Sequence, residues 1–140
     1  MYTYFLVATE NEIAQLKSVD DVCKHIEKTK PMLGGKLFTL QAMNNLSNIF
    51  LQNEKENPVA TNWFADGARF YVFDEEFCEK ITSAKWDDLL QASVPWSESK
   101  SWRNIEYNRM DLAGSIIDVA SLCKQTGEGK LLYILLSDED

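Results

Sequence analysis

The stretch that decides the fold is residues 108–136, which read NRMDLAGSIIDVASLCKQTGEGKLLYILL. Apolar residues recur at helical spacing in its first half, and polar residues occupy the opposite side of the same helix. The apolar stripe consists of Leu112, Ile116, Val119, Ala120 and Cys123, widened by Ile117. Gly127 suits the left-handed position beyond a helix end, and residues 131–136 that follow are all apolar. A strand that is apolar on both faces belongs inside a sheet, so this block predicts a helix lying across a buried strand.

A second strand is predicted near the start of the chain, where residues 2–7 are rich in aromatic and β-branched side chains. The sequence Thr9-Glu10-Asn11-Glu12 follows it and has the pattern of a capping box. In such a box Thr9 accepts a bond from the third helical N–H, and Glu12 reaches back to the backbone of Thr9. A helix is therefore expected directly after the strand.

Residues 60–73 carry the clearest hairpin signal, because Asp66-Gly67 supplies the two residues that a type I′ turn needs. Pairing across a two-residue turn places Trp63 opposite Phe70 and Phe64 opposite Arg69. The second pair predicts a cation–π contact.

These elements predict an α+β fold with one domain over residues 1–140. Its sheet is expected to be four-stranded and mixed, formed by the N-terminal strand, the 60–73 hairpin and the C-terminal strand. About five helices are expected to cover it, and residues 2–7 and 131–136 are expected to be the central strands.

The negative charge lies mostly in the second half of the chain. The net charge is −8, and residues 71–140 contain fourteen acidic residues against seven basic ones. This distribution argues against nucleic acid as a partner, since binding to a phosphate backbone needs clustered Lys and Arg. It permits a basic protein partner. No apolar run approaches membrane-spanning length, so a soluble protein without a membrane partner is expected.

The three cysteines, Cys23, Cys78 and Cys123, are far apart and each is adjacent to apolar residues of a predicted helix. Without paired spacing they indicate reduced, buried thiols and a cytoplasmic location. A Cys–His nucleophilic pair requires His25, the only histidine, to meet Cys78 or Cys123 in space, and the sequence leaves that open.

Other chemical motifs are weaker, so neither a catalytic residue, a metal site nor a cofactor is predicted. Ser97-Glu98-Ser99-Lys100 matches the S-x-x-K pattern, but it falls in a predicted loop without the companion motifs. Gly34-Gly35-Lys36 lacks the first glycine and the final Ser or Thr of a phosphate-binding loop. Helix capping and exposed helix faces explain the cluster of acids at Asp74, Glu75, Glu76, Glu79, Asp87 and Asp88.

The candidate binding site is the aromatic segment 93–107, which is expected to be the longest irregular stretch. Its candidate residues are Trp96, Trp102, Arg103 and Tyr107. Trp, Tyr and Arg are enriched at binding hot spots, and long loops are often functional. The alternative is that both tryptophans fold back as lids over the final helix.

Three segments resemble the YfbM-like family of small, uncharacterised bacterial proteins. They are the opening strand with Thr9-Glu10-Asn11-Glu12-Ile13, the run from strand into helix over residues 69–81, and the closing helix leading into residues 130–136. The resemblance covers about half of the chain and implies a single α+β domain. It implies no chemistry and assigns no functional residue.

The sequence therefore predicts a cytoplasmic protein-binding module, of the immunity or inhibitor type, rather than an enzyme. The alternative is a small enzyme or small-molecule binder with a pocket under the 93–107 loop. The oligomeric state stays open.

Overall fold

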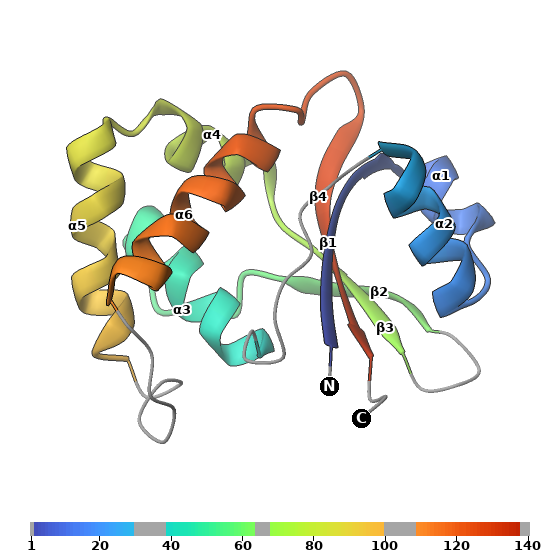
Figure 1. Ribbon diagram of the computed structural model, residues 1–140, viewed down its shortest axis with the longest axis horizontal. Helices are drawn as coiled ribbons and strands as arrows, with labels where there is room; N and C mark the ends of the chain where they lie inside the picture. Colours follow the sequence, from blue (N-terminus) through green and yellow to red (C-terminus); the bar gives the residue numbers. More distant parts are fainter. Residues whose placement is uncertain (1, 30–38, 64–67, 100–108, 138–140) are drawn as a thin grey trace.

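The computed structural model describes residues 2–29, 39–63, 68–99 and 109–137. These residues form a single α+β domain, in which one sheet lies between two helical layers (Figure 1). The strands are β1 (Tyr2–Thr9), β2 (Val59–Trp63), β3 (Arg69–Val72) and β4 (Lys130–Ser137). The helices are α1 (Glu10–Gln15), α2 (Val19–Thr29), α3 (Leu40–Leu51), α4 (Glu75–Ser83), α5 (Trp86–Ser97) and α6 (Arg109–Cys123).

The strand order is β1-β4-β3-β2, and every neighbouring pair is antiparallel. The predicted mixed sheet is therefore wrong in its strand directions, although four strands is correct. β4 is central, as predicted, whereas β1 lies at an edge of the sheet. The described residues also contain six helices rather than about five.

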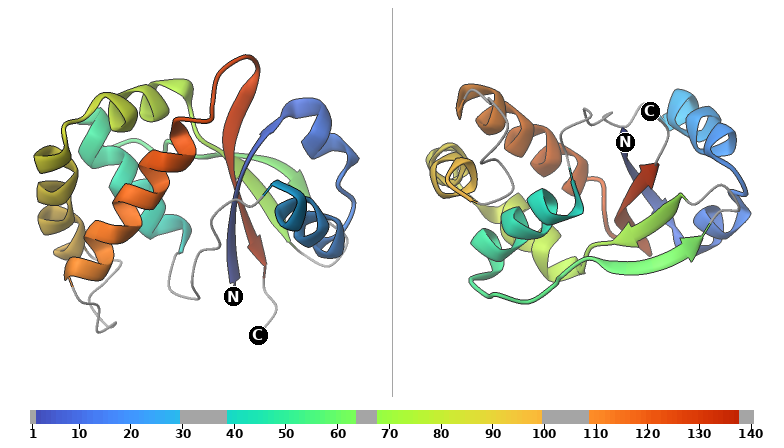
Figure 2. Two further views of the ribbon diagram at one scale, coloured as in Figure 1. Left: turned by 45° about the horizontal axis from the view of Figure 1, so that its top comes forward. Right: turned by 90° about the horizontal axis from the view of Figure 1, so that it is seen from below.

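The alternation of side chains along β4 explains why this strand is apolar on both faces. Leu132 and Ile134 belong to one hydrophobic cluster, and Tyr133 and Leu135 belong to the other. The first cluster packs the sheet against α3, α4, α5 and α6, and the second packs it against α1 and α2, on the opposite face (Figures 1 and 2). One strand thus contributes to both cores, which is what the sequence of 131–136 predicted.

The helix starts follow the capping chemistry of the sequence. Thr9 Oγ1 accepts from the Glu12 N–H at 3.2 Å, and a Glu12 carboxylate oxygen accepts from the Thr9 N–H at 3.0 Å. The predicted capping box is confirmed. Thr39 and Asp74 cap α3 and α4 with one side-chain bond each, which they accept from the N–H groups of Ala42 and Glu76.

The hairpin differs in register from the prediction. Trp63 pairs with Arg69 rather than with Phe70, and the register shifts again between Ala60 and Trp63. The turn at residues 64–67, and with it the predicted contact of Phe64, lies outside the described residues. The Arg69 guanidinium instead lies over the ring of Tyr71, 5.8 Å from its centroid.

Candidate functional site

Of the predicted binding residues, Trp96 is a core residue. Its side chain is completely buried, and its indole N–H donates to the Ala42 carbonyl at 2.8 Å, which ties α5 to α3. It therefore offers no surface to a partner, in agreement with the alternative of a core lid. Trp102, Arg103 and Tyr107 lie outside the described residues, so their role stays a prediction.

The prediction of an irregular segment from residue 93 is wrong for residues 93–97, which form the last part of α5. The helix continues through Pro95, although proline removes one backbone donor from a helix interior. Buried side chains on one face hold it in place, namely Leu89, Ala92, Ser93 and Trp96. Their helical spacing is visible in the sequence, but the proline and the serines favoured a loop.

The outward side of α5 carries an exposed apolar row. Trp86 is 62% exposed, Leu90 37% and Val94 36%, and they recur at four-residue intervals along the helix. We call these three residues the α5 stripe. Helix α5 forms the outer end of the helical layer in all three views (Figures 1 and 2). Exposed large apolar side chains in a row are unusual on a protein surface and mark interaction sites.

A small hollow of about 220 Å³ adjoins the α5 stripe at Trp86. Three helices line it, with Ile81, Thr82 and Ala84 at the end of α4, Trp86 and Leu89 from α5, and Ile117, Ala120, Ser121 and Lys124 in or just after α6. The hollow gives an inserted side chain from a partner a recess of mixed polar and apolar lining beside an aromatic ring.

Exposed acids lie along α4 and at the start of α5. They are Asp74, Glu75, Glu76 and Glu79 at α4 and Asp87 and Asp88 in the first turn of α5. Lys80 and Lys85 are the exposed bases among residues 74–88. Within the described ranges, no group of three or more His, Cys, Asp or Glu residues is arranged to hold a metal ion. Asp87 and Asp88 directly follow Trp86 in α5, whereas Asp74 and Glu75 lie at the start of α4, beside Val59.

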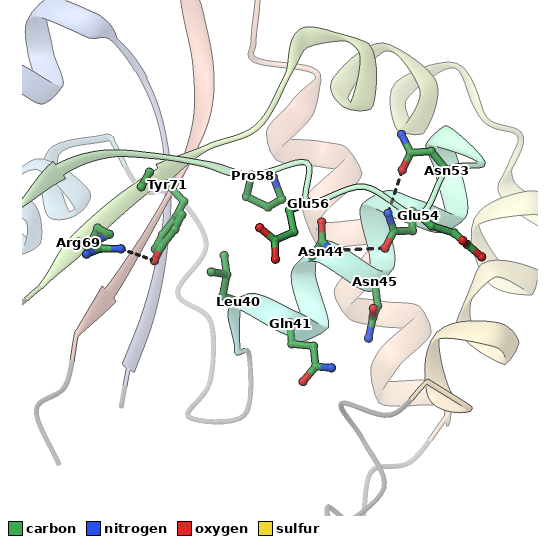
Figure 3. Close-up of a pocket in the computed structure, with 12 residues that line it drawn as sticks. Leu40, Gln41, Asn44, Asn45, Asn53, Glu54, Glu56, Pro58, Arg69 and Tyr71 are labelled. Carbon is green, nitrogen blue, oxygen red and sulfur yellow. Dashed lines mark hydrogen bonds between the residues drawn. The ribbon is translucent and has the colours of Figure 1, made fainter.

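A second concave feature lies between α3 and the strands β2 and β3. This groove, which we call the α3 groove, has a volume of about 830 Å³. Figure 3 shows its lining, with Gln41, Asn44 and Asn45 on α3, Glu54, Glu56 and Pro58 on the segment after α3, and Arg69 and Tyr71 on β3. The sequence reading missed this site, because its residues come from three segments that only the fold brings together.

A network of side-chain amides builds one wall of the α3 groove. The Asn57 N–H donates to Asn44 Oδ1 at 2.8 Å, and Asn57 Nδ2 donates to the buried Ser47 Oγ at 2.8 Å. Asn48 Nδ2 donates both to Asn53 Oδ1 and to the Lys55 carbonyl, each at 2.9 Å. Residues 53–57 are thereby fixed along α3.

At the other end of the groove, Arg69 orients Tyr71. An Arg69 Nη donates to the Tyr71 hydroxyl oxygen at 3.2 Å, and Tyr71 is half-buried (Figure 3). Because that oxygen accepts a bond from a guanidinium, its own proton remains to be donated elsewhere.

The structure keeps Cys78 and Cys123 apart from His25. Cys78 and Cys123 are buried in the cluster on the α3–α6 face, whereas His25 is on α2, which packs on the other face of the sheet. A hydrogen bond between the two thiols lowers the pKa of Cys78 and raises the pKa of Cys123. The pairing of His25 with either thiol, which the sequence left open, is not formed.

Compared with known proteins by sequence and by fold, the chain matches no family model, no curated protein and no solved structure. The resemblance to the YfbM-like family therefore stays a prediction. Across the described residues, the helices are all too short or too polar to cross a lipid bilayer.

Proposed function

We propose that this protein is a non-enzymatic binding module whose α5 stripe docks on a basic protein, in the manner of an immunity or inhibitor protein. The observation that carries the proposal is the exposure of Trp86 at the start of α5, directly before the exposed acids Asp87 and Asp88. An exposed tryptophan supplies a large apolar contact at low entropic cost, and tryptophan is the most frequent type of binding hot spot.

The charge around the α5 stripe specifies the kind of partner. Six exposed acids lie at the N-cap of α4, on α4 and on the first turn of α5, and Lys124 is the charged residue that lines the hollow itself. A partner with Lys or Arg around an apolar knob complements both features, since opposite potentials steer association and exclude like-charged competitors. Nucleic acid and anionic membranes are disfavoured for the same electrostatic reason.

A cytoplasmic location is part of this proposal. It is supported by the three free cysteines, two of which lie within hydrogen-bonding distance of one another as thiols. Neighbouring thiols persist in a reducing compartment. A small enzyme or small-molecule pocket under the 93–107 loop remains the alternative, and Trp102, Arg103 and Tyr107 remain its candidate residues.

The test is to place a photo-crosslinking amino acid at position 86 and identify the trapped protein from the native host by mass spectrometry. The purified partner is then titrated with wild type, with Trp86→Ala and with Val59→Ala. Val59 is a matched control because it is 59% exposed but lies on β2, in the sheet. We expect Trp86→Ala to weaken binding by about 30-fold and Val59→Ala to leave it unchanged.

The partner should carry a basic surface, and its affinity should fall as salt rises through the range in which the Debye length drops below about 10 Å. Equal affinity of Trp86→Ala and wild type would overturn the proposal. So would a homodimer that Trp86→Ala dissociates in sizing chromatography, because the α5 stripe would then be covered by a second copy of this chain.

A further inference from the structure

The α3 groove is separate from the α5 stripe, and its chemistry points to a different kind of ligand. Its volume of about 830 Å³ falls in the range of small-molecule sites. The lining combines side-chain amides, two carboxylates, one tyrosine and a few apolar groups from Leu40, Pro58 and Ala60 (Figure 3).

The arrangement of the amides argues against an extended peptide as the ligand. Side-chain amides on a helix are well suited to bind a peptide backbone, but here the chain itself takes that place. The Asn57 N–H and the Lys55 carbonyl are bonded to Asn44 and Asn48. A ligand of the α3 groove must therefore lie beside residues 53–57 and not in their position.

The charges argue against an anionic ligand. Glu54 and Glu56 line the groove against a single cation, Arg69, and the guanidinium of Arg69 is already directed at the hydroxyl and ring of Tyr71. A phosphate or carboxylate would meet two carboxylates without a cation positioned to receive it.

The side chains of the groove that can still form hydrogen bonds with a ligand are suited to bind hydroxyl groups. The side chains of Gln41 and Glu56 are exposed and, within the described part of the chain, make no hydrogen bond, while the Tyr71 hydroxyl keeps a proton to donate. An amide both donates and accepts, a carboxylate accepts, and a hydroxyl does both, so these groups bind neutral polyols. The ring of Tyr71 adds an apolar surface for the C–H groups of such a molecule.

We propose that the α3 groove is a binding site for a neutral saccharide, held by Gln41, Glu56 and Tyr71. The bonds among Asn44, Asn48 and Asn57 order the wall of the groove, and Arg69 orients Tyr71, so the ordering cost of binding falls on the side chains of Gln41 and Glu56.

The test uses the full-length chain on an array of neutral oligosaccharides ending in glucose, galactose, mannose or N-acetylhexosamines, with heparin and sialylated glycans as anionic probes. The best neutral glycan is then titrated by NMR with wild type, Gln41→Ala, Glu56→Ala and Glu79→Ala. Glu79 is an exposed acid on α4, outside the groove, and serves as the control.

We expect a neutral glycan to bind, with Gln41→Ala and Glu56→Ala each weakening it about tenfold and Glu79→Ala having no effect. Both groove residues are exposed, so the variants keep the fold, and unchanged amide spectra check this. Binding only of the anionic glycans, no binding of any neutral glycan at millimolar concentration, or full affinity in both groove variants would each overturn the proposal.

Discussion

At the scale of single residues, two tryptophans of one helix lie in opposite environments. Trp86 and Trp96 are both on α5, ten residues apart, yet the first is mostly exposed and the second has no exposed surface. Their immediate neighbours do not separate them, because Asp87 and Asp88 follow the first and Ser97 and Glu98 follow the second. What separates them is the position of α3, whose Ala42 carbonyl receives the N–H of Trp96.

This difference predicts opposite sensitivities to replacement by phenylalanine. Trp96→Phe removes a buried donor, leaves the Ala42 carbonyl without its bond and creates a cavity, so the free energy of unfolding should fall by about 2–3 kcal/mol. Trp86→Phe should change it by less than about 0.5 kcal/mol. Urea unfolding of both variants measures this, and similar losses in the two would contradict the assignment of Trp96 to the core.

The capping box gives a pH-dependent prediction at the same scale. The hydrogen bond from the Thr9 backbone N–H lowers the pKa of Glu12 below its ordinary value of 4.5. A carboxyl with a lowered pKa in the folded state stabilises the fold above its unfolded pKa, and this contribution is lost as the pH falls through the folded value.

Glu12→Gln should therefore reduce the free energy of unfolding at pH 7, by no more than about 1 kcal/mol because the group is well solvated. The gap between variant and wild type should narrow as the pH falls through the lowered pKa of Glu12, because its carboxylate is then protonated. Glu10→Gln, in the same helical turn, is the control. A gap that stays constant from pH 7 to pH 3 would rule out the carboxylate as its source.

At the scale of elements, the sequence predicted those features of the helices and strands that depend on a pattern within one segment. The capping box of α1, the apolar stripe of α6 and the double burial of β4 were all readable, because each depends on spacing within one segment. Strand order, the edge position of β1 and the α3 groove depend on which segments meet across long sequence distances. The predicted hairpin register assumed a two-residue turn and an unbroken ladder, whereas Trp63 pairs with Arg69 and the register shifts again between Trp63 and Ala60.

The turn between α6 and β4 provides a test at the element scale. Gly127 has φ +117°, a backbone conformation that L side chains rarely adopt, whereas Gly114 is inside α6. An added Cβ meets nothing within 4 Å at either position, so only backbone preference distinguishes them.

Gly127→Ala should destabilise the protein by about 1–2 kcal/mol, and Gly114→Ala should stabilise it by up to about 1 kcal/mol. Thermal unfolding of the two variants measures the signs. If both substitutions shift the melting temperature in the same direction, the positive φ of Gly127 does not determine the stability of the turn.

At the scale of the whole molecule, the two hydrophobic clusters are not independent, because β4 supplies side chains to both. Ile134 and Leu135 are neighbours in sequence and completely buried, but they belong to different clusters. Truncating either side chain destabilises β4, and β4 also supplies side chains to the other cluster. We therefore infer that the helices on both faces unfold together.

Ile134→Ala and Leu135→Ala should each reduce the free energy of unfolding by about 2–5 kcal/mol. Each variant should still show one transition, with fluorescence and far-UV circular dichroism curves that coincide. Separate transitions for the two probes would show that the faces unfold as two units.

The pairing of β1 with β4 has a consequence for synthesis on the ribosome. It joins Tyr2 to Ser137, so the contacts that close the sheet span nearly the whole described sequence. Contacts this distant slow folding, because a long loop must close before they form. Among the described strands, β1 pairs with β4 alone, so during translation it cannot pair until β4 has been made, and its apolar side chains stay accessible to chaperones until then.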